Sequence, residues 1–106
     1  SPAVHRYVGC MAGYGYESWS RAGREIAASF ATEGTPLDAL AALEDPCPTL
    51  HLYAQPRDDA YLTAQQAAAA RLGWFRVERL EASSHFPMLE VPDALAGHVD
   101  RFVAGL

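Results

Sequence analysis

The chain has 106 residues, of which half are apolar and a fifth are charged, so it has the composition of one small globular domain or of part of a larger one. Its net charge is −5 and all eight basic residues are arginine. A protein that follows nucleic acid or an anionic membrane would need clustered positive charge, so we expect neither partner. The lysine-free, alanine-rich composition suggests a bacterial genome of high GC content.

The sequence shows neither a signal peptide nor an apolar run of about 20 residues, the length of a membrane span. We therefore expect a cytoplasmic protein. Cys10 and Cys47 lack the CxxC spacing of zinc ligands, so we expect no metal and two reduced, buried thiols, although a disulfide stays open.

The N-terminal part predicts two helices. Residues 1–16 mix small and aromatic side chains and are expected to be irregular. Residues 17–31 predict an amphipathic helix that ends at Gly34, with an apolar stripe of Trp19, Ala22, Gly23, Ile26 and Phe30. A second helix over 36–43 follows, capped by Thr35, with three leucines facing inward: Leu37, Leu40 and Leu43.

Pro46 and Pro48 mark a linker, because neither fits a helix interior or a central strand. We then expect a strand over 49–54, a helix over 60–72, a strand over 75–80 and a helix over 92–104. Asp58 or Asp59 is the expected cap of the first of these helices. The last helix carries the apolar stripe Leu95, Val99, Phe102, Val103 and Leu106.

This β-α-β-α order predicts an α/β fold with parallel strands, because the crossover between two such strands is right-handed. Two parallel strands alone make a poor sheet, since parallel sheets need several strands and both faces covered. The chain is therefore expected to be the C-terminal β-α-β-α segment of a larger α/β sheet, preceded by helices outside the repeat.

His85 is the strongest candidate for a catalytic residue. It stands in a short loop, Ser83-Ser84-His85-Phe86-Pro87-Met88, between the second strand and the last helix. Catalytic groups of α/β enzymes gather at the carboxyl ends of strands. A histidine there is suited to be a general base, because its unperturbed pKa of about 6.5 lets it accept a proton at neutral pH.

Residues 49–106 resemble the C-terminal end of the α/β-hydrolase superfamily. The resemblance is carried by Pro48-Thr49-Leu50-His51-Leu52-Tyr53, by Ser84-His85-Phe86-Pro87 and by Val91-Pro92-Asp93. It implies that residues 49–106 are the C-terminal portion of the hydrolase core. It also implies that residues 1–48 are the end of the cap region and a linker.

A narrower resemblance is to the cofactor-free 2,4-dioxygenases of 3-hydroxy-4-oxoquinolines and quinaldines, on Tyr53-Ala54-Gln55-Pro56, Gly73-Trp74-Phe75 and His85-Phe86-Pro87. It implies that His85 removes the proton of the substrate 3-hydroxyl. The electron-rich aromatic then reacts with dioxygen, the ring opens and carbon monoxide leaves. The implied partners are a small aromatic N-heterocycle and dioxygen, with no cofactor or metal.

The rest of the catalytic group is expected outside this chain. No Gly-x-Ser-x-Gly nucleophile elbow is present, so we expect the chain alone to be inactive without the missing N-terminal half. The superfamily's common Gly-x-x-Asp acid is also missing after the first strand, which favours the dioxygenases. Asp58 is only a fallback triad acid, because helix capping explains it.

Three side chains are candidates for substrate binding. Trp19 could stack on a flat ring or pack in the cap, while Phe86 and Met88 could line an apolar pocket or anchor the loop. Glu81 and Glu90 flank the loop, but no paired-carboxylate geometry follows from their positions. Of the other histidines, His51 is expected on a sheet face and His98 in solvent.

Two further hypotheses stay open. One is a hydrolase of the same fold that acts on an ester, epoxide or halide, with its nucleophile upstream. The other is a non-catalytic interaction module, whose exposed sheet edge pairs with a partner or with a second copy.

Overall fold

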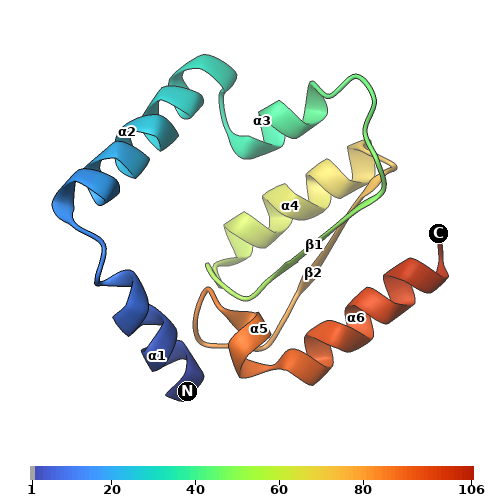
Figure 1. Ribbon diagram of the computed structural model, residues 1–106. Coiled ribbons are helices and arrows are strands. Elements are labelled where there is room, and N and C mark those ends of the chain that lie inside the picture. Colours follow the sequence, from blue (N-terminus) through green and yellow to red (C-terminus); the bar gives the residue numbers. More distant parts are fainter. Residues whose placement is uncertain (1) are drawn as a thin grey trace. The chain divides into compact units, whose positions relative to one another are not determined.

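The computed structural model describes residues 2–106 and divides into two compact units, Pro2–Glu44 and Asp45–Leu106. The first unit contains helices α1 (Pro2–Met11), α2 (Tyr16–Glu33) and α3 (Pro36–Ala41) (Figure 1). The second contains β1 (Thr49–Tyr53), α4 (Asp59–Arg71), β2 (Phe75–Arg79), α5 (Pro87–Glu90) and α6 (Pro92–Ala104). The assignment of residues 1–48 to a cap and of 49–106 to a core stays a prediction.

Helix α1 corrects the prediction that residues 2–11 are irregular. Pro2 begins this helix, where a missing amide hydrogen removes no helical bond. The glycine and aromatic residues that suggested a loop fall mostly behind the helix, where Gly13 and Gly15 belong to the connection to α2. The helix was missed because those turn residues dominated the composition of the whole segment.

The junction between α2 and α3 follows the prediction. Gly34 ends α2 with φ of 78°, a conformation that favours glycine, and a Cβ there would lie 2.8 Å from Asp38 Oδ2. Thr35 caps α3: its Oγ1 accepts from the Asp38 amide, and Asp38 Oδ2 accepts from the Thr35 amide at 3.0 Å. Leu43 corrects the prediction, because α3 ends at Ala41 and leaves this side chain 53% exposed.

β1 and β2 pair in parallel, in register from Thr49 opposite Phe75 to Tyr53 opposite Arg79. The parallel α/β arrangement is therefore confirmed. The amide of Leu80 donates to Tyr53 O at 2.7 Å, which continues the pairing past the end of β2. The loops that follow both strands therefore start from the same edge of the sheet.

Helices α4 and α6 lie on opposite faces of the two strands (Figure 1). On the α4 face, His51 stacks on Tyr53 with ring centroids 5.3 Å apart, and Tyr61 of α4 meets Tyr53 edge-on at 5.0 Å. The buried apolar core of the described residues is small: Tyr53, Ala54, Ala68, Phe75 and Leu80. Cys10 and Cys47 are free thiols, but both are exposed, so the expectation that they are buried is wrong.

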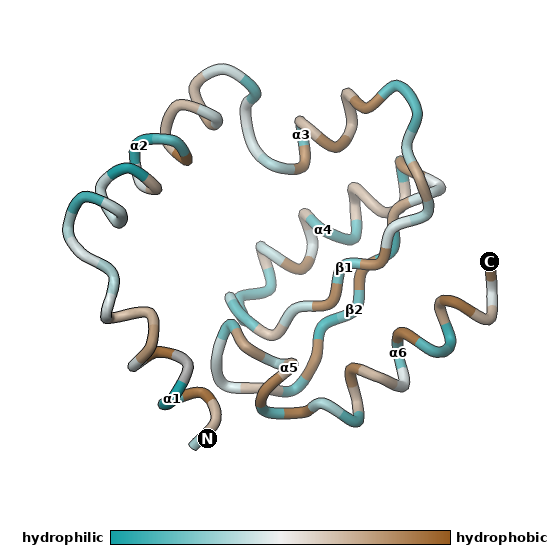
Figure 2. The backbone as a smooth tube through the Cα atoms, in the orientation of Figure 1, coloured by the Kyte–Doolittle hydropathy of each residue, from teal (hydrophilic) through white to brown (hydrophobic). Residues whose placement is uncertain are grey.

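Helix α6 turns only part of its predicted apolar stripe, Leu95 and Phe102, toward the sheet. Phe102 lies half-buried beneath the Arg76 guanidinium, whose carbon is 5.9 Å from the ring centroid. Apolar residues recur along this helix (Figure 2), but Val99, Val103 and Leu106 are 40%, 58% and 73% exposed. These residues belong to the same predicted stripe, but they lie on the part of it that the two strands do not cover.

Among residues 2–106, no helix combines the length and the apolar character needed to cross a membrane.

Candidate functional site

His85 lies in the connection between β2 and α5, after the carboxyl end of β2, and its side chain is exposed. Leu80, directly after β2, is 4% exposed and anchors the start of this connection in the core. Pro87, two residues after His85, is buried and begins α5. The histidine therefore projects from a short segment that is fixed at both ends.

The loop after β1 holds the first part of the His85 connection. Arg57 donates from Nη1 to Leu80 O at 3.2 Å and from Nη2 to Glu81 Oε1 at 2.9 Å. Gln55 donates from Nε2 to Ala82 O at 3.1 Å. Two side chains of one loop thus fix three consecutive residues of the other.

Glu90 holds the second part of the connection that contains His85. Its Oε1 accepts from the Ser83 hydroxyl at 2.7 Å and from the Ser83 amide at 3.3 Å. Its Oε2 accepts from the Ser84 amide at 2.9 Å and from the Ser84 hydroxyl. Hydrogen bonds from Ser84 and then Ser83 lower the pKa of Glu90 to about 2, against a smaller opposing effect of desolvation. The sequence prediction treated Glu90 only as a flanking carboxylate.

α5 is an element that the sequence prediction missed. Its four residues begin at Pro87, and the Val91 amide closes it by donating to Pro87 O at 2.8 Å. Pro92 then begins α6. A proline at the first helical position was the available signal, but one turn is too short to give a helical period. α5 matters for the site because its last residue is Glu90.

Phe86 and Met88 adjoin His85 along the chain, as predicted. Phe86 is half-buried and Met88 is 50% exposed. Each is an apolar, partly exposed side chain close to the histidine in sequence, and their roles in substrate binding stay predictions.

Trp19 belongs to the unit of residues 2–44. Its side chain is 49% exposed and lines, with Met11 and Tyr14, a shallow apolar hollow of about 220 Å³. Its predicted stacking on a substrate ring stays a prediction.

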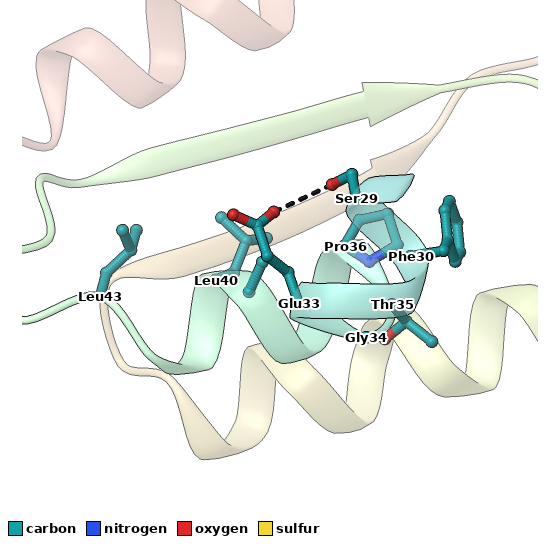
Figure 3. A pocket seen from close by; sticks show the side chains of 9 residues that line it. Ser29, Phe30, Glu33, Gly34, Thr35, Pro36, Leu40 and Leu43 are labelled. Atoms are coloured by element: carbon teal, nitrogen blue, oxygen red, sulfur yellow. Dashed lines mark hydrogen bonds between the residues drawn. The ribbon is translucent and has the colours of Figure 1, made fainter. Parts of the chain in front are cut away.

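The same unit contains a larger apolar groove between α2 and α3, with a volume of about 410 Å³ (Figure 3). Phe30, Pro36 and Leu40 contribute apolar walls. The carboxylate of Glu33 accepts a hydrogen bond from the Ser29 hydroxyl at 2.9 Å. The residues that line the groove include no histidine or cysteine.

Asp58 acts as a helix cap. Its Oδ1 accepts from the Tyr61 amide at 2.8 Å, at the start of α4, which confirms the predicted capping. Its neighbour Asp59 lies 3.8 Å from the Arg79 guanidinium. Neither contact connects these carboxylates to His85, and the fallback role of Asp58 as triad acid stays a prediction.

Two other histidines, His51 and His98, are partly buried against neighbouring side chains. His51 Nδ1 lies 3.0 Å from Oε1 of the buried Gln65, which confirms a satisfied sheet-face histidine. His98 was predicted to be solvated, and that prediction is wrong. It is half-buried and lines a small cavity of about 110 Å³ between α6 and the sheet, because the helix turns this face inward.

Within residues 2–106, no three side chains of His, Cys, Asp or Glu gather as metal ligands would. The described residues therefore present one exposed histidine on a well-anchored loop, with apolar side chains beside it. Such a group can accept a proton from a bound substrate.

Comparison with known proteins finds relatives of one kind. The chain is 36% identical over 86 residues to the 2-heptyl-3-hydroxy-4-quinolone dioxygenase AqdC1 of Rhodococcus erythropolis, over 81% of this chain and 31% of the relative. It is 38% identical over 87 residues to the 1H-3-hydroxy-4-oxoquinoline 2,4-dioxygenase of Pseudomonas putida, over 82% of this chain and 33% of that protein. No family model matches.

Solved structures agree with these relatives. One match is a variant of AqdC in complex with its substrate, with a TM-score of 0.81 at 34% identity. AqdC cleaves the ring of the Pseudomonas quinolone signal. The match covers 89% of this chain and 35% of that one. The structure of 1H-3-hydroxy-4-oxoquinoline 2,4-dioxygenase also matches with a TM-score of 0.81, at 36% identity, over 88% of this chain and 35% of that chain.

The chain thus spans about a third of the length of the relatives that it matches. Sequence and structure select the same group of proteins, and the parallel strands with helices on both faces fit the fold of that group. The chain is therefore a C-terminal portion of the α/β-hydrolase fold that is related, in sequence and in structure, to the 2,4-dioxygenases of 3-hydroxy-4-quinolones.

Proposed function

We propose that the chain forms the C-terminal part of a cofactor-independent 2,4-dioxygenase that cleaves the heteroaromatic ring of a 3-hydroxy-4-quinolone. The observation that carries this proposal is His85, exposed on an anchored loop after β2 in a chain that matches such dioxygenases at up to 38% identity. As part of the same proposal, we expect the protein in the cytoplasm.

In this function His85 is the general base. It accepts the proton of the substrate 3-hydroxyl, and the resulting anion is electron-rich enough to react with dioxygen directly. Ring opening then releases carbon monoxide. A positioned base of this kind contributes about 10²- to 10⁴-fold to a rate.

The substrate class follows from the relatives. Those that the chain matches are named for 2-heptyl-3-hydroxy-4-quinolone and for 1H-3-hydroxy-4-oxoquinoline, which share a flat 3-hydroxy-4-quinolone nucleus. Phe86 and Met88 supply apolar surface next to the base, as such a nucleus requires, and Trp19 is the proposed stacking partner.

The test uses the chain joined to upstream sequence that completes the length of its relatives, here termed the extended protein. With 3-hydroxy-4-oxoquinoline, we expect the extended protein to consume oxygen and to release carbon monoxide. His85→Ala should lower kcat by about 10²- to 10⁴-fold, because the substrate keeps its proton.

Trp19→Ala serves as a second variant, which should raise KM more than it lowers kcat if the indole stacks on the ring. Unchanged turnover in His85→Ala would contradict the base role. An extended protein that hydrolyses esters and leaves the quinolone intact would contradict the reaction type.

A further inference from the structure

The carboxylate of Glu90 makes an unusually concentrated set of contacts. Both of its oxygens are used, each by one serine, and each serine donates from its amide and from its hydroxyl. Hydrogen bonds to an ionised acceptor are about twice as strong as neutral ones. Four such bonds from consecutive residues fix the backbone and the side-chain rotamers of Ser83 and Ser84 together.

The hydrogen-bond network of Glu90 also reaches Phe86, the residue that follows His85 in the chain. The Ser84 hydroxyl donates to Glu90 and accepts from the Phe86 amide at 3.1 Å. A hydroxyl can do both, since it has one hydrogen and two lone pairs. The residues before and after His85 are thus tied, directly or through one hydroxyl, to the same carboxylate.

Glu81, a second carboxylate near His85 in the chain, gives a contrast within the same molecule. The Glu81 side chain is 86% exposed and, among the residues that the structure describes, pairs with Arg57 alone. Exposed ion pairs of this kind contribute little to stability, because water screens the two charges. Its removal leaves the Arg57 bond to Leu80 O in place. Glu81 is therefore a matched control: it is the same residue type and contacts the same connection, but its hydrogen bond goes to Arg57 and not to the Ser83–Ser84 segment.

We propose that Glu90 is a positioning residue for His85, because its carboxylate holds Ser83 and Ser84, and through Ser84 the amide of Phe86, in the one loop conformation that presents the imidazole to the substrate. The inference rests on the proposed base role of His85. Glu90 itself touches no reacting atom in this scheme. Its effect reaches the chemical step only through the place of the imidazole, and a misplacement of about 1 Å can cost roughly 10²-fold in rate.

The experiment measures kcat and KM for oxygen consumption with 3-hydroxy-4-oxoquinoline in five variants of the extended protein: Glu90→Gln, Ser84→Ala, Ser83→Ala, Glu81→Gln and His85→Ala. Glu90→Gln keeps the size of the side chain but replaces one acceptor oxygen by a donor. We expect it to lower kcat by about 10- to 100-fold and to change KM by less than about threefold. Glu81→Gln should stay within about twofold of the wild type in both constants.

The two serine variants should lower kcat by different amounts. Ser84→Ala removes the bridge to Phe86 but keeps the amide bond to Glu90, so it leaves the backbone anchor in place. Ser83→Ala removes a hydroxyl whose hydrogen bond, within residues 2–106, goes to Glu90 alone. We therefore expect a larger loss of kcat in Ser84→Ala than in Ser83→Ala, and faster exchange of the Phe86 amide hydrogen only in the former.

A double variant separates positioning from a general structural effect. If Glu90 acts through the imidazole, Glu90→Gln should change the residual rate of His85→Ala by less than about threefold, since the group to be positioned is already gone. A further fall by the same factor as in the wild type would overturn the inference.

The inference and the proposed function fail in different ways. Full activity in His85→Ala overturns the function itself. An inactive His85→Ala, together with Glu90→Gln and Ser84→Ala both within twofold of the wild type, overturns only the role of Glu90. Should Glu90→Gln fold poorly, Ser84→Ala and its Phe86 amide exchange decide the question.

Discussion

At the scale of single residues, the site depends on how one loop is held. The sequence singled out His85 because a histidine between a strand and a helix is chemically suggestive by its position alone. Glu90 carried no comparable signal: it stands five residues later and could have faced solvent. Only the turn of α5 brings its carboxylate back onto Ser83 and Ser84.

The lowered pKa of Glu90 gives a pH prediction. The free carboxyl titrates near 4.5 and the folded one at about 2, so the ionised form is favoured in the folded loop. The stabilisation by this carboxylate is therefore fully present above 4.5 and is lost as the pH falls toward 2.

The measurement is an NMR titration of the Ser83 and Ser84 amide protons in the extended protein. We expect their shifts to follow a group with a midpoint of about 2, and to lose that transition in Glu90→Gln. A midpoint near the unperturbed 4.5 would show that the four hydrogen bonds do not persist in solution.

At the scale of elements, the sequence predicted best where two local signals agreed. Thr35 before Pro36, and Gly34 before both, defined the start of α3, and Asp58 defined the start of α4. α6 has the predicted bounds of 92 and 104. The prediction failed at α1, where turn residues behind the helix masked it, and at α5, which is a single turn.

Asp58 gives a prediction at this scale, because helix capping needs only a hydrogen-bond acceptor, whereas a triad acid needs a carboxylate. Asn caps a helix about as well as Asp, so Asp58→Asn in the extended protein should leave both the unfolding free energy and kcat nearly unchanged. Asp58→Ala removes the acceptor for the Tyr61 amide and should cost about 1 kcal/mol of stability.

Urea unfolding and oxygen-consumption kinetics, measured side by side, check this. A fall of kcat in a stable Asp58→Asn would instead identify Asp58 as the acid of the triad.

At the scale of the whole molecule, the chain leaves much apolar surface in water. Along the predicted stripe of α2, Trp19, Ile26 and Phe30 are 49%, 60% and 50% exposed. On α6, Val103 is 58% exposed. A chain with a small core and such exposed stripes has surfaces that further protein, upstream sequence or a second copy, would cover.

The corresponding prediction concerns the 106 residues by themselves. We expect no oxygen consumption with 3-hydroxy-4-oxoquinoline, because His85 then lacks the rest of the catalytic group. We also expect binding of a dye that reports exposed apolar surface, and this binding should fall in the extended protein.

Size-exclusion chromatography with light scattering tests the remaining hypothesis of self-association through the sheet edge. A monomer would argue against an obligate pair of copies. Turnover by the isolated chain would contradict the expected dependence on upstream sequence.

The sequence by itself determined the local elements other than α1 and α5, the parallel order of the strands and the loop histidine. These depend on short-range patterns: capping residues, helix breakers and the alternation of side chains in a strand. The tertiary structure decided which part of a helix face is buried, that His98 turns inward, and which carboxylate holds the His85 loop. These depend on what lies across from a side chain. The geometry of the turns decides which groups face each other, and the periodicity of the sequence contains no information about it.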